Sequence, residues 1–285
     1  MILLDGKKLS EKILSTLKLR ILESIENGNR VPRLDIILVG EDFASKKYVG
    51  LKMDRACEIG IKVVLHEFDT NVSTEELLSL VRELNQDSRV DGVMVQLPLP
   101  DGIDTSVVLD SIWVEKDVDG LTSSNLGKLF KNDNTAIIPA TARGILELLK
   151  EYKINIDGAK AVVVGRSNIV GLPTSAVLQN NNATVTVCHS HTKQLKKITT
   201  QADILVVAIG KGEYIDKDFV KENSVVIDVG ININDKGKMV GDVKFNSVSK
   251  VASFLSPVPG GVGPMTVASL ILNVVEIYEK NIKRF

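Results

Sequence analysis

Apolar residues recur along the chain in two alternating patterns, which predict helices and strands in turn. From Leu9 to Ile25 every fourth residue is apolar, as on the buried face of a helix. Short runs rich in Val and Ile follow, each ended by Gly, Pro or polar residues, and such runs are typical of buried strands. Helices that alternate with apolar strands favour parallel sheets covered on both faces, so the expected fold class is α/β.

The pattern falls into two series on either side of Pro139, which predicts two domains with a boundary near residue 140. In the first series we expect strands at 34–39, 61–68 and 90–95 and helices at 44–59 and 74–85. In the second we expect strands at 160–164, 183–187, 204–208 and 225–229 and helices at 141–150, 173–179 and 265–280. Periodicity alone does not decide which domain the last helix joins.

Composition narrows the class of protein. The 285 residues include 35 Lys and Arg and 36 Asp and Glu, a formal net charge of -1 that argues against binding nucleic acid through a general basic field. The chain lacks an apolar run of the roughly 18 residues that span a bilayer, and its start does not resemble a leader. Cys57 and Cys188 are far apart, so neither a disulfide framework nor a metal site is expected. We expect a cytoplasmic protein without a membrane partner.

A glycine-bounded loop follows the predicted strand at 160–164. It runs from Gly165 to Gly171, and Pro173 then begins a helix. A strand, a glycine turn and a helix N-terminus form a phosphate site, because free backbone N–H groups face the anion. The spacing is not GxGxxG, so an ordinary strand-to-helix turn remains an alternative.

The strand that follows this loop bears on the choice of cofactor. NAD sites usually end this strand with an acid that holds the ribose 2′-hydroxyl, but here Cys188-His189-Ser190-His191 follow. With Arg166 in the glycine loop, a cation and a hydroxyl without a carboxylate favour NADP over NAD. For the two histidines a solvated loop is the simpler interpretation.

Tyr48 and Lys52 are four residues apart on the predicted helix at 44–59, so they share one face at the rim of an apolar stripe. A partly desolvated lysine has a lowered pKa and can act as a base near neutrality. The alternative is a surface lysine whose stem covers apolar area. Short-chain dehydrogenases also use Tyr-x-x-x-Lys, but there the pair follows the nucleotide loop, whereas here it precedes it.

Three further polar residues are candidates for the same chemistry. Gln96 stands where the strand at 90–95 ends, and parallel strands place ligands at their carboxyl ends. Asp117 and Asp119 lie in Lys-Asp-Val-Asp-Gly, which fits either a functional pair or turn-forming aspartates. His66 lies within a strand, which favours a structural role.

Five segments in order resemble the methylenetetrahydrofolate dehydrogenase/cyclohydrolase family: VGEDFASKKYVGLKMDRACEIGI (39–61), DGVMVQLPLP (91–100), KDVDG (116–120), VVVGRSNIVGLP (162–173) and PVPGGVGPMT (257–266). The resemblance covers essentially the whole chain. It implies a folate-binding catalytic α/β domain of residues 1–140 plus 264–285, to which the last helix returns, and a Rossmann-like NADP-binding domain of residues 141–263. It also implies a homodimer.

The resemblance implies a role for each matching residue. Lys52 would be the acid/base at the folate one-carbon centre, Gln96 would hold its protonation state, and Tyr48 would orient the folate. Asp119, Pro259, Gly260 and Gly263 would contact the tetrahydrofolate substrate. The residues implied to bind NADP are Gly165, Arg166, Ser167, Ile169, Ser190 and Ile231. The expected reactions are NADP-dependent oxidation of 5,10-methylenetetrahydrofolate and hydrolysis of the methenyl product to 10-formyltetrahydrofolate.

The chain departs from the family at two places. Leu121-Thr122-Ser123 replace the usual Phe-His-Pro, and Pro139-Ala140-Thr141-Ala142 replace Pro-Cys-Thr-Pro. Two alternatives therefore stay open, a two-domain dehydrogenase of another small substrate of the shikimate type and a nucleotide-binding regulatory protein with a degenerate active site.

Overall fold

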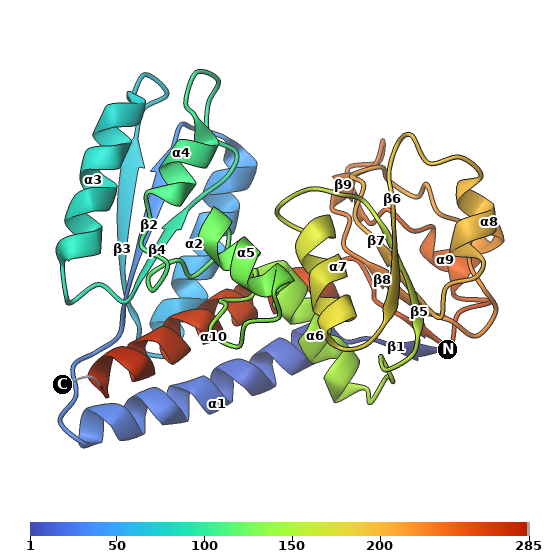
Figure 1. Cartoon of the computed structure of the whole chain (residues 1–285), viewed down its shortest axis with the longest axis horizontal. Coiled ribbons are helices and arrows are strands. Elements are labelled where there is room, and N and C mark those ends of the chain that lie inside the picture. The colour runs from blue at the N-terminus through green and yellow to red at the C-terminus, as the bar shows by residue number, and fades with distance from the viewer. Residues whose placement is uncertain (284–285) are drawn as a thin grey trace. The chain divides into compact units, whose positions relative to one another are not determined.

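The computed structural model describes residues 1–283 and divides the chain into two compact units (Figure 1). The first unit comprises Glu11–Ala140 and the chain from Val267 onward, and the second comprises Met1–Ser10 and Thr141–Thr266. The long helices α1 (Gly6–Glu26) and α10 (Val262–Ile282) each begin in the second unit and continue into the first. Each unit is therefore assembled from segments that are discontinuous in sequence.

The first unit has a three-stranded parallel sheet in the order β3-β2-β4. Its strands are β2 (Arg33–Val39), β3 (Lys62–Phe68) and β4 (Gly92–Val95), and its further helices are α2 (Phe43–Glu58), α3 (Thr74–Gln86), α4 (Thr105–Asp110) and α5 (Ser123–Phe130). Ser73 and Glu76 form a capping box that begins α3. The expected α/β class with parallel strands is confirmed.

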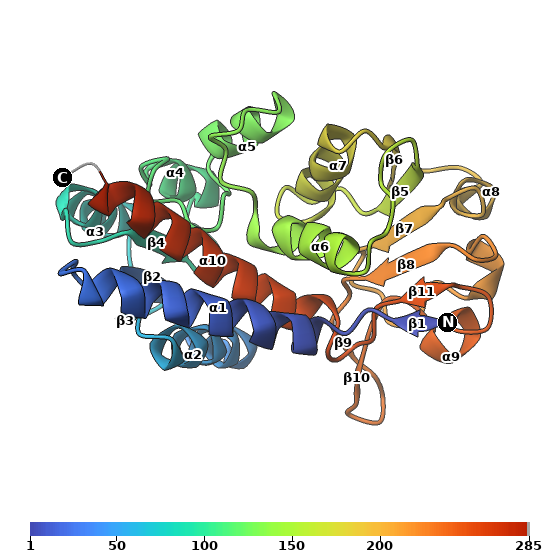
Figure 2. The same ribbon diagram turned by 90° about the horizontal axis from the view of Figure 1, so that it is seen from below.

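Both faces of the central strand β2 are buried. Leu34, Ile36 and Leu38 lie in a core with residues of α1, α2 and α10, whereas Ile37 and Val39 lie in a second core with α3 and α4. Successive side chains of a strand point to opposite faces, so this continuous apolar run requires helices on both sides. Figure 2 shows α1 and α10 running together along the unit, where Arg20 forms an ion pair of 2.6 Å with Glu279.

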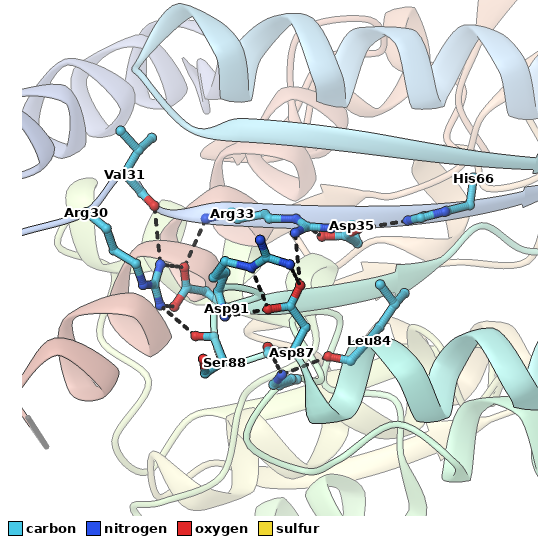
Figure 3. A network of polar contacts seen from close by, with 11 residues as sticks. Arg30, Val31, Arg33, Asp35, His66, Leu84, Asp87, Ser88 and Asp91 are labelled. Atoms are coloured by element: carbon cyan, nitrogen blue, oxygen red, sulfur yellow. Dashed lines mark hydrogen bonds and ion pairs between the residues drawn. The ribbon is translucent and has the colours of Figure 1, made fainter.

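The amino ends of β2 and β4 are joined by a network of ion pairs (Figure 3). Arg30 makes two 2.6 Å hydrogen bonds to the fully buried carboxylate of Asp91, which also accepts from the backbone of Arg33. Arg33 pairs with Asp35, and Asp35 in turn lies 2.8 Å from Nε2 of His66. These contacts give His66 a structural place in the sheet, as expected.

The second unit has a six-stranded parallel sheet in the order β1-β11-β8-β7-β5-β6. Its strands are β1 (Ile2–Leu3), β5 (Lys160–Val164), β6 (Thr184–Cys188), β7 (Ile204–Val207), β8 (Val225–Asp228) and β11 (Phe254–Leu255). β9 (Asn232–Ile233) and β10 (Met239–Val240) form a separate hairpin. The remaining helical elements are α6 (Ala140–Glu151), α7 (Gly171–Asn180), α8 (Leu195–Thr199), α9 (Phe245–Val248) and the 3₁₀ helix η1 (Lys217–Phe219).

The first residues of the chain lie elsewhere than the sequence prediction placed them. Residues 1–10 were expected in the N-terminal domain, but Ile2 and Leu3 pair in parallel with Phe254 and Leu255 at the edge of the six-stranded sheet. A two-residue strand carries no hydrophobic period, so its position depends on a partner about 250 residues away in the chain rather than on local pattern.

The C-terminal helix α10 is the one helix of residues 1–283 that is long and apolar enough to span a membrane by length and composition. Of its most apolar stretch, 67% is buried within the fold. Its apolar side chains, among them Leu270, Ile271 and Val274, belong to the core of the first unit. This burial is typical of a core helix.

We expect Asp91→Ala to lower the free energy of unfolding of the first unit by about 3 kcal/mol or more, because it leaves the Arg30 guanidinium without its buried partner. Urea unfolding followed by circular dichroism measures the change. The control is Glu75→Ala, which removes an exposed ion pair with Arg82 and should cost less than about 1 kcal/mol. Equal losses for the two variants would contradict a structural role for the network.

Candidate active site

Helix α2 carries Lys52 into the interior of the first unit. The helix begins after Asp42, whose carboxylate accepts a 2.8 Å hydrogen bond from the backbone of Ser45. Lys52 is only 9% exposed and shares the buried face of the helix with Val49 and Ala56. The alternative of a lysine lying over the surface does not describe this side chain.

The Lys52 amine lies between two neutral acceptors at the end of β4. Its Nζ donates to Oε1 of Gln96 at 3.0 Å and lies 3.3 Å from Sδ of Met94. The Gln96 amide donates in turn to the carbonyl of Leu97 at 2.7 Å, so its NH₂ group is occupied and its oxygen faces the lysine. Gln96 therefore presents an acceptor that carries no charge.

This environment favours the uncharged amine. Burial lowers the pKa of Lys52, and the negative charge of Asp119 opposes this effect without outweighing it. Burial likewise raises the pKa of Asp119, while the Lys52 charge acts in the opposite direction. Each group thus has its charged form disfavoured by the protein and supported chiefly by the other.

The two aspartates of the Lys-Asp-Val-Asp-Gly segment have separate tasks. Asp117 is buried and accepts from the backbone of Leu121 and Thr122 and from Nδ2 of Asn125, at 3.2, 2.9 and 2.8 Å. It orders the turn, which agrees with the turn-forming interpretation for this residue. Asp119 is the member that acts electrostatically on Lys52. Asn125 was not among the predicted site residues, and only its family motif could have indicated it.

Tyr48 lies one turn before Lys52 on α2 and is half-buried. Burial raises the pKa of its phenol, so the hydroxyl stays protonated near neutrality. A half-exposed, uncharged ring on the face of a catalytic helix can stack on a planar ligand.

The glycine loop of the second unit is shaped by close backbone packing. Gly165 has φ +127°, and a Cβ there would lie 2.2 Å from the carbonyl oxygen of Ala208. A Cβ on Gly171 would lie 2.3 Å from the carbonyl oxygen of Gly165. Only glycine fits at either position, so the two glycines bring the end of β5 against the start of α7.

The residues between these glycines face solvent and offer donors. Within the described chain, the backbone N–H groups of residues 166–169 have no hydrogen-bond acceptor, whereas those of Val170 and Gly171 reach Oγ of Ser167 at 3.2 and 3.5 Å. Arg166, Ser167 and Ile169 are all exposed, and α7 begins beside them. Free N–H groups at a helix N-terminus fit a diphosphate.

The end of the neighbouring strand β6 carries a second candidate site for an anion. Val164 of β5 pairs with Cys188 of β6, so Arg166 and Ser190 each follow a paired position by two residues. Both are exposed. His189 accepts the backbone N–H of His191 at its Nδ1, at 3.2 Å, which orders the turn that carries Ser190. A cation and a hydroxyl at this place fit a 2′-phosphate.

The remaining predicted residues lie in loops of the second unit or at the start of α10. Ile231 follows β8 and is 46% exposed. Pro259 is exposed, Gly260 has φ +102° and accepts from the backbone of Lys7 at 2.9 Å, and Gly263 lies in the first turn of α10. The structure thus brings Lys52, Gln96 and Asp119 together in the first unit. The glycine loop and Ser190 come together in the second.

Family comparisons match nearly the whole chain. Residues 4–119 match the tetrahydrofolate dehydrogenase/cyclohydrolase catalytic domain, and residues 139–282 match the NAD(P)-binding domain of the same family. The chain belongs to this family. The bifunctional protein FolD of Ligilactobacillus salivarius is 51% identical over 280 residues, which cover 98% of both chains.

Solved structures agree with this assignment. FolD from Campylobacter jejuni has a TM-score of 0.97 and 45% identity over 98% of this chain and 99% of its own. The Trypanosoma brucei methylenetetrahydrofolate dehydrogenase-cyclohydrolase, which was solved with NADP and an inhibitor, has a TM-score of 0.94 and 35% identity over 99% of both chains. Shikimate 5-dehydrogenase from Thermus thermophilus, at 15% identity and a TM-score of 0.55, shares the fold alone.

The departures from the tetrahydrofolate dehydrogenase/cyclohydrolase family pattern have structural explanations. Thr122 is the N-cap of α5 and accepts from the backbone of Asn125 at 3.2 Å. Ala140 and Ala142 lie in the first turn of α6 and are buried. Helix capping and close packing therefore account for these residues, and neither change alters the contacts of Lys52.

We expect Lys52→Met to raise the free energy of unfolding by about 1 kcal/mol at neutral pH, because it replaces a desolvated amine with an apolar side chain of similar length. The lowered pKa means that wild-type stability rises with pH in the window between the folded pKa and the ordinary lysine pKa of about 10.4. The gain should therefore shrink as pH rises through that window.

Urea unfolding at several pH values measures this gain. Lys47→Met, at an exposed position of the same helix, is the control and should change stability by less than about 0.5 kcal/mol at every pH. A loss of stability in the Lys52 variant would mean that the contacts of the amine outweigh its burial.

Proposed function

We propose that this chain oxidises 5,10-methylenetetrahydrofolate to the 5,10-methenyl form with NADP and hydrolyses that product to 10-formyltetrahydrofolate. The observation that carries the proposal is the buried Lys52 amine held by Gln96 beside Asp119. A single amine whose charged form is disfavoured is suited to moving one proton at a reacting carbon. Family membership supplies the substrate class.

The residues of the second unit fit NADP. The free N–H groups of residues 166–169 would take the diphosphate, Arg166 and Ser190 the 2′-phosphate, and Ile169 and Ile231 would cover apolar ring surface. When bound, NADP accepts the hydride that leaves the methylene carbon. The protein contributes to this step mainly by aligning the folate carbon with the cofactor.

The residues proposed to bind the folate are those that the family resemblance implies. Tyr48 would lie against the ring system of the folate, and Asp119 would accept hydrogen bonds from its pterin edge. The turn of Pro259, Gly260 and Gly263 would contact the substrate, where the absence of bulky side chains allows close approach.

The hydrolysis needs a base. Water adds to the methenyl carbon and gives its proton to the neutral Lys52 amine, which forms an ammonium held by Gln96 and Asp119. The carbon–N5 bond then breaks, N5 receives a proton, and the hydroxyl on the carbon becomes the formyl carbonyl as its proton leaves. One proton is released overall, and Lys52 returns to its neutral form.

Two alternatives have less support. The shikimate-type enzymes share only the fold with this chain. A degenerate regulatory protein would not need to keep a buried lysine, because a buried amine that meets only neutral acceptors is costly to bury.

We also propose that the protein forms a homodimer through β3. This strand pairs only with β2 within the described sheet, whereas the free edge of β4 is met by the segment at Asp117. Val63, Val64 and Leu65 on β3 are partly exposed, and an open edge strand with apolar side chains is suited to pairing with a second copy.

The two unpaired cysteines, Cys57 and Cys188, support a reducing cytoplasmic location.

Reduction of NADP and of NAD, followed side by side with and without 5,10-methylenetetrahydrofolate, tests the first reaction. We expect folate-dependent reduction with a preference for NADP, and Arg166→Ala should reduce that preference by about 10- to 100-fold because it removes a charge-assisted phosphate contact. Lys160→Ala, at the other end of β5, is the control. An unchanged preference would sink the 2′-phosphate assignment, and absence of folate-dependent reduction would sink the function.

Methenyl hydrolysis tests the role of Lys52. We expect Lys52→Met to slow it at least 100-fold, since a positioned general base typically contributes roughly that much. In the wild type the rate should rise with pH as the amine loses its proton. Gln96→Glu should move this rise to higher pH by about one unit or more, because a carboxylate supports the ammonium.

Gln86→Glu, the same substitution at an exposed position of α3, is the control for the pH profile and should leave it unchanged. If the pH dependence of hydrolysis is the same in Gln96→Glu as in the wild type, the increase of the rate with pH cannot be assigned to Lys52.

Analytical ultracentrifugation tests the dimer. A Val64→Lys variant places a charge on the β3 edge, outside the core that Val63 and Leu65 pack against, and should shift the protein towards monomer, whereas Leu22→Lys on the exposed face of α1 should not. A wild-type monomer, or equal behaviour of both variants, would contradict the interface.

A further inference from the structure

Asp242 is a buried carboxylate that the proposed chemistry does not use. It follows the hairpin of β9 and β10, is fully buried, and forms no ion pair within the described chain. A buried charge without a cation must be held by dipoles and hydrogen bonds, so its partners indicate its purpose.

Four donors converge on this carboxylate. Its Oδ2 accepts from the backbone of Ile209 and Gly210 at 2.6 and 3.0 Å, and its Oδ1 accepts from the backbone of Lys211 at 2.7 Å and from Nδ2 of Asn232 at 2.9 Å. Three successive N–H groups around one anion form a nest. Asp242 therefore fixes the loop after β7 and ties it to the loop after β8.

A second buried carboxylate holds Asp242 itself. Asp228, at the end of β8, accepts from the backbone of Asp242 at 2.9 Å, of Val243 at 3.0 Å and of Gly230 at 3.0 Å. Burial and the Asp242 charge raise the pKa of Asp228 to about 7, although the backbone donors act in the opposite direction. Burial and the neighbouring carboxylate therefore disfavour the charged form of Asp228.

Two glycines pack so closely against the carboxylate pair that no side chain fits at either position. A Cβ on Gly230 would lie 2.3 Å from Cγ of Asp242, and a Cβ on Gly241 would lie 1.8 Å from Oδ2 of Asp228. Between Gly230 and Asn232, which are both bound to the carboxylates, Ile231 is exposed. Its backbone is fixed on both sides while its side chain faces solvent.

The order of the strands places these loops relative to the cofactor. The glycine loop follows β5, the 2′-phosphate contacts follow β6, and β7 and β8 lie on the opposite side of β5. A dinucleotide bound across the carboxyl ends of such a sheet has its diphosphate at the glycine loop and its two halves on either side. The loops after β7 and β8 therefore receive the nicotinamide half.

We propose that Asp242 is a positioning residue for the nicotinamide half of NADP, acting through the backbone of 209–211 and through Asn232 beside Ile231. The inference rests on the proposed NADP site of this chain. The four donors held by Asp242 thus serve to align the hydride acceptor, a task separate from recognition of the 2′-phosphate.

Asp242→Asn tests the proposal, because it keeps the shape and replaces one acceptor oxygen with a donor that faces N–H groups. We expect binding of NADP to weaken about 10-fold and kcat for folate oxidation to fall about 10- to 100-fold, as for other residues that orient a reacting group. Binding of 2′-phospho-ADP-ribose, which lacks nicotinamide, should stay within about twofold. The rate of methenyl hydrolysis, measured without NADP, should likewise stay within about twofold of the wild-type rate.

Asn232→Ala is the second variant, since it removes one donor from a partly exposed side chain and is expected to fold. It should produce the same pattern at smaller size, and Asp216→Asn, at the cap of η1, should produce none. Equal weakening of NADP and 2′-phospho-ADP-ribose, or no weakening of either, would overturn the proposal. The binding titrations with NADP and with 2′-phospho-ADP-ribose need no folate. They therefore test the role of Asp242 even if the proposed folate reactions are not observed.

Discussion

In the main sheet of each unit the strands run parallel, so every strand ends at the same edge of its sheet. Gln96 follows β4, Gly165 follows β5, Ser190 follows β6 and Ile231 follows β8. Within the second unit, Gly165, Ser190 and Ile231 come to one edge of the sheet although they are distant in sequence, because each lies shortly past a strand whose register is fixed by its pairing. The opposite ends of β2 and β4 carry the Arg30–Asp91 network, which stabilises rather than reacts. Parallel pairing thus places the candidate site residues at the carboxyl ends of the strands and the stabilising ion pairs at the amino ends.

The first unit buries an amine, Lys52, and the second buries two carboxylates, Asp228 and Asp242. Lys52 meets a neutral amide and a thioether, and Asp242 meets N–H dipoles, so neither charge is cancelled by a hydrogen-bonded counter-ion. A counter-ion would hold each group in its charged form more readily. A counter-ion beside Lys52 would keep the amine protonated, so it could no longer accept a proton. Asp242 only has to accept hydrogen bonds, so N–H donors are sufficient partners for it. The partners in each case match the task.

The long strands and helices could be predicted from sequence because their apolar runs are buried on both faces, as in β2, or on one stripe, as in α10. The strands β1 and β11 could not, since two residues show no period. Tyr48 and Lys52 were placed on one helical face by spacing alone. The contact of Lys52 with Gln96 spans 44 residues, so the position of Gln96 at a strand end left it open whether the amide meets the lysine or a substrate. Asp242 lies in a polar stretch without pattern, and its significance depends on donors from two other loops.

The discontinuous units bear on how the chain is made. The core of the first unit contains Val267, Ala268, Leu270 and Ile271 from α10, although its sheet is complete by Val95. During synthesis on the ribosome this sheet therefore emerges long before the helix that covers one of its faces. The part of this core that α10 covers stays open while residues 141–266 of the second unit are translated, a period in which shielding by a chaperone would be of most use.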